Sequence, residues 1–178
     1  MKRTLAGLLA LAAALSLPAA ARAQVTPFSI EPRIGVAAPV ATTADDEQTG
    51  LAIGGDVIFR ITPLVSIYGG YEWQRANAAG ADSVDLSFYG WEGGIRLTFS
   101  PIGPYTPFVR GGLVYKRGKA ETDGGQVLTG DQATGFEVGV GTEIGIPRVP
   151  VALTPQVGFS TVQNDQWAYV QVGLHIRI

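Results

Sequence analysis

Residues 135–146 read Gly-Phe-Glu-Val-Gly-Val-Gly-Thr-Glu-Ile-Gly-Ile and alternate strictly between two kinds of side chain. The even-numbered positions carry apolar residues or threonine, and the odd-numbered positions carry glycine or glutamate. A period of two over this length predicts a β-strand with one apolar and one polar face, because a helix would scatter these residues around its axis. Glycine dominates the polar face, so we interpret that face as the lining of a tight, polar interior.

The same alternation recurs along the rest of the chain, in the segments 28–38, 51–61, 65–74, 86–99, 105–117, 151–161 and 167–178. Each segment is close to the ~9–11 residues that a tilted transmembrane strand needs. The connections alternate between long and short, the longest being 118–133. The pattern predicts an all-β fold, an eight-stranded antiparallel up-and-down transmembrane β-barrel with its long loops at one rim. Pro32 and Pro155 lie within strands, where proline removes a ladder donor, and predict bulges.

The N-terminal residues 1–23 have the features of a signal peptide. Lys2 and Arg3 precede an apolar run from Leu5 to Leu17, and Ala21-Arg22-Ala23 fits a cleavage site. We therefore predict export, with residues 24–178 as one β-barrel domain. The chain has 13 Lys and Arg residues against 15 Asp and Glu, and three of the basic residues lie in the predicted signal peptide. This acidic balance argues against nucleic acid as a partner.

The polar faces of the strands carry charges of both signs, whereas the apolar faces carry none. Charges enclosed in a barrel must be paired, and both partners are available. We therefore predict an interior charge network formed by Glu31, Arg33, Asp56, Arg60, Glu72, Glu92, Arg96, Arg110, Lys116, Glu137, Glu143, His175 and Arg177. We expect Arg96 and Arg110, on adjacent strands, to neutralise Glu92 and other inward glutamates such as Glu137.

Aromatic residues on the apolar faces gather near both ends of the strands. Those near the short turns are Phe28, Phe59, Phe99 and Tyr105, and those toward the long loops are Tyr71, Trp73, Tyr89, Trp91, Tyr115, Phe136 and Phe159. Two aromatic belts around an aliphatic band are typical of a protein that meets two membrane interfaces. A soluble lipocalin-like carrier, with its apolar face inward, has no reason for such belts. We therefore predict that the apolar face contacts lipid.

The last strand ends in Val170-Gln171-Val172-Gly173-Leu174-His175-Ile176-Arg177-Ile178. With this strand the mature chain resembles the small eight-stranded outer-membrane barrels of the OmpA/OmpX kind. The resemblance implies the outer membrane of a Gram-negative cell, a monomer, and a bilayer and lipopolysaccharide as surroundings. It also implies that the barrel-assembly machinery reads Val170, Val172, Leu174, Ile176 and Ile178 as a sorting signal. That family usually ends in an aromatic residue, whereas this chain ends in isoleucine.

The predicted interior leaves two functions open. Ion pairs can fill it, which gives a structural barrel or one that presents loops to partners, or the inward glycines can leave a narrow pore for small solutes. The size of an eight-stranded barrel favours a filled interior. Acidic loop residues, which are Asp45, Asp46, Glu47, Asp82, Asp123 and Asp131, would face outside and bind cations that bridge lipopolysaccharide phosphates, bind a surface partner, or stay solvated.

Catalysis is the third possibility, as a lipid-modifying hydrolase. The single histidine, His175, points inward between Leu174 and Ile176. A hydrolase needs a nucleophile, a base and an orienting group in contact, which this pattern does not supply. The chain has no cysteine and one histidine, so we predict neither a metal site nor a cofactor. We predict that the protein is not an enzyme.

Overall fold

A computed structural model describes residues 27–41, 49–78, 84–122, 127–162 and 165–178. It contains eight strands: β1 (Phe28–Ala41), β2 (Gly50–Arg60), β3 (Val65–Ala78), β4 (Val84–Thr98), β5 (Tyr105–Thr122), β6 (Val127–Gly145), β7 (Val151–Val162) and β8 (Asp165–Arg177). The predicted signal peptide lies outside the described residues, so its cleavage stays a prediction.

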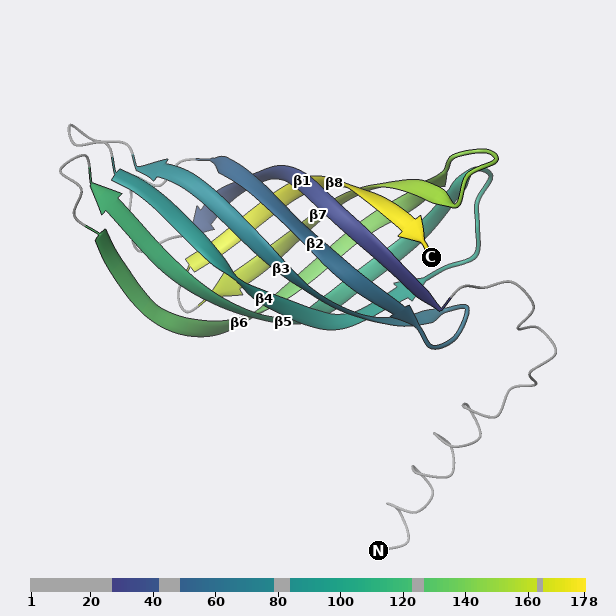
Figure 1. The fold of residues 1–178 in the computed structure, drawn as a ribbon, viewed down its shortest axis with the longest axis horizontal. Coiled ribbons are helices and arrows are strands. Elements are labelled where there is room, and N and C mark those ends of the chain that lie inside the picture. The colour runs from purple at the N-terminus through teal and green to yellow at the C-terminus, as the bar shows by residue number, and fades with distance from the viewer. Residues whose placement is uncertain (1–26, 42–48, 79–83, 123–126, 163–164) are drawn as a thin grey trace, which may run out of the picture.

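Each strand pairs antiparallel with the next, and β8 pairs with β1, so the sheet is a closed barrel. Figure 1 shows strands that are strongly tilted to the long axis. The connections β2–β3, β4–β5 and β6–β7 lie at one end of the barrel, and the other connections lie at the opposite end. We call these the turn end and the loop end. The predicted fold, an eight-stranded antiparallel up-and-down barrel, is confirmed.

The two faces of the barrel wall differ as the alternation predicts. On β6 the outward Val138 and Val140 are 50% and 52% exposed, whereas the inward Glu137 is 3% exposed. Exposed aliphatic residues of the other strands, such as Ile34, Val57, Ile95 and Val170, continue the apolar band around the barrel. This outer surface suits lipid, and the inner surface takes the place of a protein core.

No helix among the described residues is long and apolar enough to cross a membrane.

Inward glycines provide room for the large side chains of the lumen. Arg33 is paired in the ladder with Gly54 on one side and Gly173 on the other. Similarly, Arg110 faces Gly139, Phe108 faces Gly141 and Tyr169 faces Gly158 across neighbouring strands. An alternation of small and large residues is how a small barrel fills its interior without strain.

The loop between β5 and β6 is shorter than the sequence predicted. Residues 118–122 continue β5, and β6 begins at Val127, so most of the expected loop 118–133 is a hairpin, with Asp131 in a strand. The extension pairs Lys119 with Thr129 and Ala120 with Leu128. It was missed because Val127 and Leu128 are exposed and no alternation of buried and exposed residues marks these positions.

The prediction of bulges at Pro32 and Pro155 is wrong. The register is the same on both sides of each proline, although the pairing of β1 with β8 skips positions 31 and 32. The register instead shifts between Pro39 and Ala41 and between Arg117 and Lys119. A missing N–H thus interrupts the ladder on one side of the strand without an extra residue.

The outer face also carries charge at the loop end, which the sequence interpretation had excluded. Arg75 on β3 is exposed and Arg117 on β5 is half-buried, and both have the parity of the apolar face. Together with Lys119 they lie where β3 and β5 extend past the predicted belt residues Trp73 and Tyr115.

Candidate functional site

The middle of the lumen holds a cluster of ion pairs, formed by Arg33, Asp56, Glu92, Arg110 and Glu137, which we call the central cluster. Arg110 donates to Asp56 at 2.9 Å, to Glu137 at 2.8 Å and to Glu92 at 3.3 Å. Arg33 binds Asp56 at 3.4 Å and also pairs with Glu92. All five side chains are at most 3% exposed. One guanidinium therefore links carboxylates from three different strands.

Tyr68 completes the central cluster. Its hydroxyl donates to Glu137 at 2.6 Å, and its ring lies 4.0 Å from the Arg110 guanidinium carbon. Tyr68 has the parity of Glu72 on the same strand, so it belongs to the polar face, but it was not among the residues predicted for the charge network. The phenol therefore fills space and gives Glu137 Oε1 a second donor beside Arg110.

A second group, the turn-side cluster, consists of Glu31, Arg96, Glu143, His175 and Arg177. Arg96 donates to Glu31 at 2.7 Å and to Glu143 at 2.9 Å. His175 Nδ1 lies 3.1 Å from Glu31, and Arg177 donates to Glu143 at 2.8 Å. Arg110 does pair with Glu92 and Glu137 as expected, whereas the expectation is wrong for Arg96, which binds Glu31 and Glu143 and not Glu92. Arg96 thus takes its partners from β1 and β6, across the lumen, and not from its own strand β4.

The last predicted network members lie toward the two ends. Glu72 accepts from Lys116 at 2.7 Å, Gln74 at 2.6 Å and Gln171 at 2.8 Å, which forms a loop-side cluster. Arg60 is half-buried at the end of β2 and interacts electrostatically with Glu143. The structure thus brings the predicted charges into three layers along the barrel axis.

An apolar plug lies in the lumen toward the loop end, formed by Ala37, Ala52, Trp167 and Tyr169. Phe88 packs against it, with its ring centroid 5.3 Å from that of Trp167. Sequence reasoning missed these aromatic residues because it assigned aromatic side chains to the outer belts. Their parity was the available signal, since Phe88 shares the face of Glu92 and Trp167 shares the face of Gln171.

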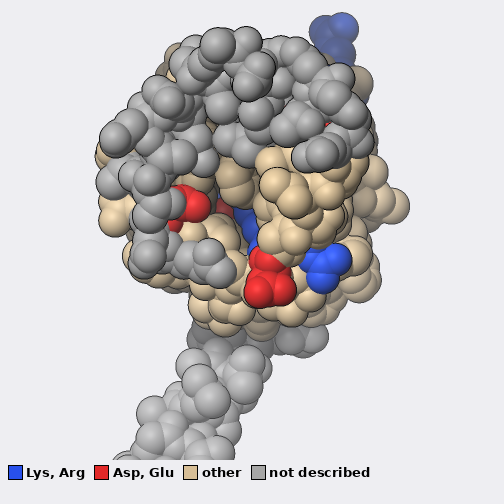
Figure 2. All heavy atoms as spheres, turned by 90° about the vertical axis from the view of Figure 1, so that its left-hand side faces the viewer, with Lys and Arg blue, Asp and Glu red and all other residues tan. Residues whose placement is uncertain are grey.

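Above the plug a cavity of about 310 Å³ opens at the loop end. Its lining includes Lys116 and Gln74 of the loop-side cluster, the rings of Phe88 and Trp167, and Asp131. Figure 2 shows this hollow end-on, with acidic atoms on its side and charged atoms at depth.

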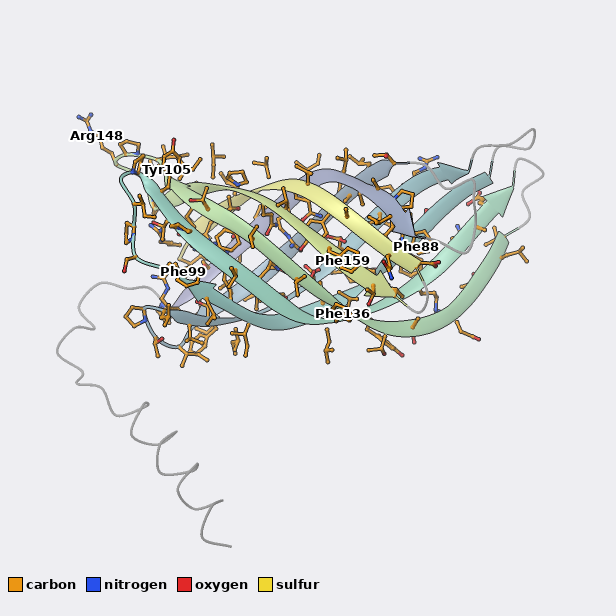
Figure 3. The ribbon with its side chains drawn as sticks, turned by 180° about the vertical axis from the view of Figure 1, so that it is seen from behind. Phe88, Phe99, Tyr105, Phe136, Arg148 and Phe159 are labelled. Carbon is orange, nitrogen blue, oxygen red and sulfur yellow. The ribbon has the colours of Figure 1, made fainter. Side chains whose placement is uncertain are left out.

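The predicted belt residues all have outward parity, and Phe28, Phe99, Tyr105, Trp91 and Phe136 are about half exposed or more. Figure 3 shows Phe99 and Tyr105 at the turn end, whereas Phe136 and Phe159 lie nearer the middle of the barrel's length. The strands continue well past Phe136. The band between the two sets therefore covers the turn-end part of the barrel and leaves a loop-end extension beyond it.

The single histidine of the chain lies inside the lumen. His175 is 2% exposed and lies 3.1 Å from the Glu31 carboxylate, away from the lipid-facing surface that a lipid hydrolase would use. Among the residues that the structure describes, no group of three His, Cys, Asp or Glu side chains is placed to hold a metal ion.

Comparison with family models decides the relationship. Residues 7–149 match the model of the outer membrane protein beta-barrel domain. The chain belongs to this family. It is thus an outer-membrane, transmembrane β-barrel protein that resides in a lipid bilayer. A comparison with curated proteins found no match.

Solved structures show the same fold at low sequence identity. Neisserial surface protein A is 15% identical with a TM-score of 0.69, covering 88% of this chain and 100% of that one. The attachment invasion locus protein Ail of Yersinia pestis is 12% identical with a TM-score of 0.56, covering 87% and 100%. The N-terminal β-barrel domain of Pseudomonas aeruginosa OprF is 14% identical with a TM-score of 0.53, covering 86% and 100%.

Proposed function

We propose that this protein is a non-enzymatic outer-membrane barrel with a closed lumen, which stabilises the membrane and presents its loop end outside the cell. The observation that carries the proposal is the filled cross-section. Phe108, Val114 and Ala52 are at most 2% exposed, and they lie among the three layers of ion pairs. An eight-stranded wall encloses room for side chains and little else.

The proposal includes the surroundings of the barrel. Lipopolysaccharide would contact the loop-side aromatic residues, and the barrel would be a monomer because closure leaves no strand edge free for a partner. The barrel-assembly machinery would recognise β8, whose alternate residues Val170, Val172 and Ile178 are 56%, 46% and 65% exposed on the outer face. Export through the signal peptide at residues 1–23 belongs to the same proposal.

A narrow pore is the second candidate, favoured by polar atoms on β7 and β8. Tyr169 Oη, Gln156 Oε1, Thr154 Oγ1 and His175 Nε2 are buried without a hydrogen-bond partner within the protein. Buried polar groups need partners, and water can supply them. A hydrated path along β7 and β8 would therefore run beside the ion pairs.

Conductance and stability of one variant separate the two candidates. The closed barrel predicts no single-channel steps for refolded wild-type protein in planar bilayers. It also predicts that Arg96→Ala loses ~3–5 kcal/mol of unfolding free energy in guanidinium titrations, because Glu31 and Glu143 lose their shared cation. Changing Arg96→Met together with Glu31→Gln should recover part of that loss.

The pore predicts the reverse for the same protein. Arg96→Ala would stay nearly as stable as wild type, and its conductance or ion selectivity would change as the lumen loses a cation. A stable Arg96→Ala barrel with altered conductance would rule out the closed lumen.

A further inference from the structure

The turn between β6 and β7 places an arginine where the backbone favours glycine. The Val149 N–H donates to the Ile146 carbonyl at 3.4 Å, so these residues close a four-residue turn with Pro147 second and Arg148 third. Arg148 has a φ of 70°. A turn with proline second and a positive φ third normally takes glycine or asparagine at the third position.

The neighbouring turn at the same end of the barrel has glycine at its position of positive φ. Between β4 and β5 the residue with positive φ is Gly103, with φ 61°. Arg148 is the one non-glycine residue with positive φ within the described ranges. An arginine kept in an unfavourable conformation indicates that its side chain has a role that glycine could not supply.

The side chain of Arg148 is free to meet a partner. It is exposed, and Figure 3 shows it pointing away from the barrel at the turn end, past Tyr105. Next to it Val149 is 48% exposed, and Ile102 on the neighbouring turn is 70% exposed. Apolar neighbours beside an arginine suit the boundary between acyl chains and headgroups, where the guanidinium reaches the polar layer.

The accessible side-chain charge at the turn end has one sign. Residues 27–31, 58–67, 95–109, 140–155 and 173–178 are all described, and their two carboxylate side chains, Glu31 and Glu143, are buried in the turn-side cluster. Arg60 and Arg177 are half-buried at the same rim and face Glu143, whereas the Arg148 side chain is exposed. At the loop end, by contrast, the outer wall mixes signs, because Lys119 pairs with Glu121 at 3.0 Å.

We propose that Arg148 binds the headgroup of an anionic phospholipid at the turn end. The proposal rests on the proposed function, because it needs the barrel in a bilayer. Anionic lipid attracts arginine near the membrane surface, and guanidinium matches phosphate geometry with paired hydrogen bonds. The shallow position beside apolar turn residues favours lipid phosphate over a polymer farther from the membrane.

Native mass spectrometry of the barrel released from nanodiscs with equal phosphatidylglycerol and phosphatidylcholine tests this site. Wild type should retain phosphatidylglycerol in preference, by about fivefold for each arginine in contact with the anionic surface. Arg148→Gln should lower the preference by about that factor. Lys119→Gln should leave it unchanged, because that cation is already paired with Glu121.

Arg148→Gly separates binding from folding. It relieves the backbone conformation, so its unfolding midpoint in pure phosphatidylcholine should equal or exceed that of wild type while its phosphatidylglycerol preference falls. An unchanged preference in Arg148→Gln, or an equal loss in Lys119→Gln, would overturn the site. A wild-type protein that fails to insert, with no band shift between heated and unheated gel samples, would instead overturn the membrane proposal and this one with it.

Discussion

Gly111 and Gly112 are neighbours on β5, yet a methyl group added to each would meet opposite surroundings. At Gly111, on the lipid side, the nearest atom to an added Cβ would be 3.7 Å away. At Gly112, on the lumen side, the Gly93 carbonyl oxygen would be 2.3 Å away and the Tyr68 hydroxyl 2.6 Å away. Gly93 and Gly94 on β4 repeat the contrast, with nearest atoms at 3.4 and 2.2 Å. The inner face is packed to contact, and the outer face is completed by lipid.

The largest expected effect belongs to the most connected charge of the inner face. Arg110→Ala should lower the free energy of unfolding by ~3–5 kcal/mol, because Asp56, Glu92 and Glu137 would then share the single cation Arg33. Urea or guanidinium titration of the refolded barrel in bilayers measures the loss. A loss below ~1 kcal/mol, the range of exposed ion pairs, would show that water reaches the central cluster.

On the outer face, adding a charge should destabilise the barrel, whereas on the inner face removing one does. Val140→Arg places a cation in the apolar band and should cost ~2–4 kcal/mol in bilayers, the penalty for a basic residue at the midplane of a barrel. Val140→Leu, which keeps the site apolar, is the matched control and should be nearly neutral. A harmless arginine at this position would mean that the outer face does not contact lipid.

The smallest expected effect is the difference in stability between alanine substitutions at the neighbouring positions 111 and 112, which face lipid and lumen. Gly112→Ala should cost ~1–3 kcal/mol, because the added methyl group forces the β4 backbone to move. Gly111→Ala should stay within about 0.5 kcal/mol of wild type, since its surroundings leave space. Equal losses in the two variants would show that strand flexibility, and not lumen packing, determines the tolerance for a side chain.

The sequence predicted the wall of this barrel better than its contents. Strict alternation, as in residues 135–146, determines which side chains face inward, because a strand has only two faces. The partner of an inward charge depends on register and tilt, which alternation does not encode. Arg96 therefore took Glu31 and Glu143 across the lumen instead of Glu92 on its own strand.

Two other errors have physical causes of the same kind. Residues 118–133 read as a loop because their outer face, past the aromatic belt, needs no apolar residues. Phe88 and Trp167 were assigned neither to the aromatic belts nor to the charge network. A lumen with an apolar plug can nevertheless bury aromatic rings as well as the bilayer interface can. In both cases the alternation of apolar and polar residues predicted the membrane-embedded wall, but it gave no information about the loop-end extension or the lumen.

Closure joins the two ends of the described chain, since the Ile178 N–H donates to the Phe28 carbonyl at 3.1 Å. β1 must therefore wait for β8, which is made much later, before its second edge is paired. Contacts between such distant segments make folding slow, because the chain entropy is lost before the contacts form. A polypeptide that stops anywhere before β8 leaves β1 and β7 with free edges, and open edges are templates for aggregation. Pairing of β8 with β1 is thus the event that turns an aggregation-prone chain into a sealed barrel.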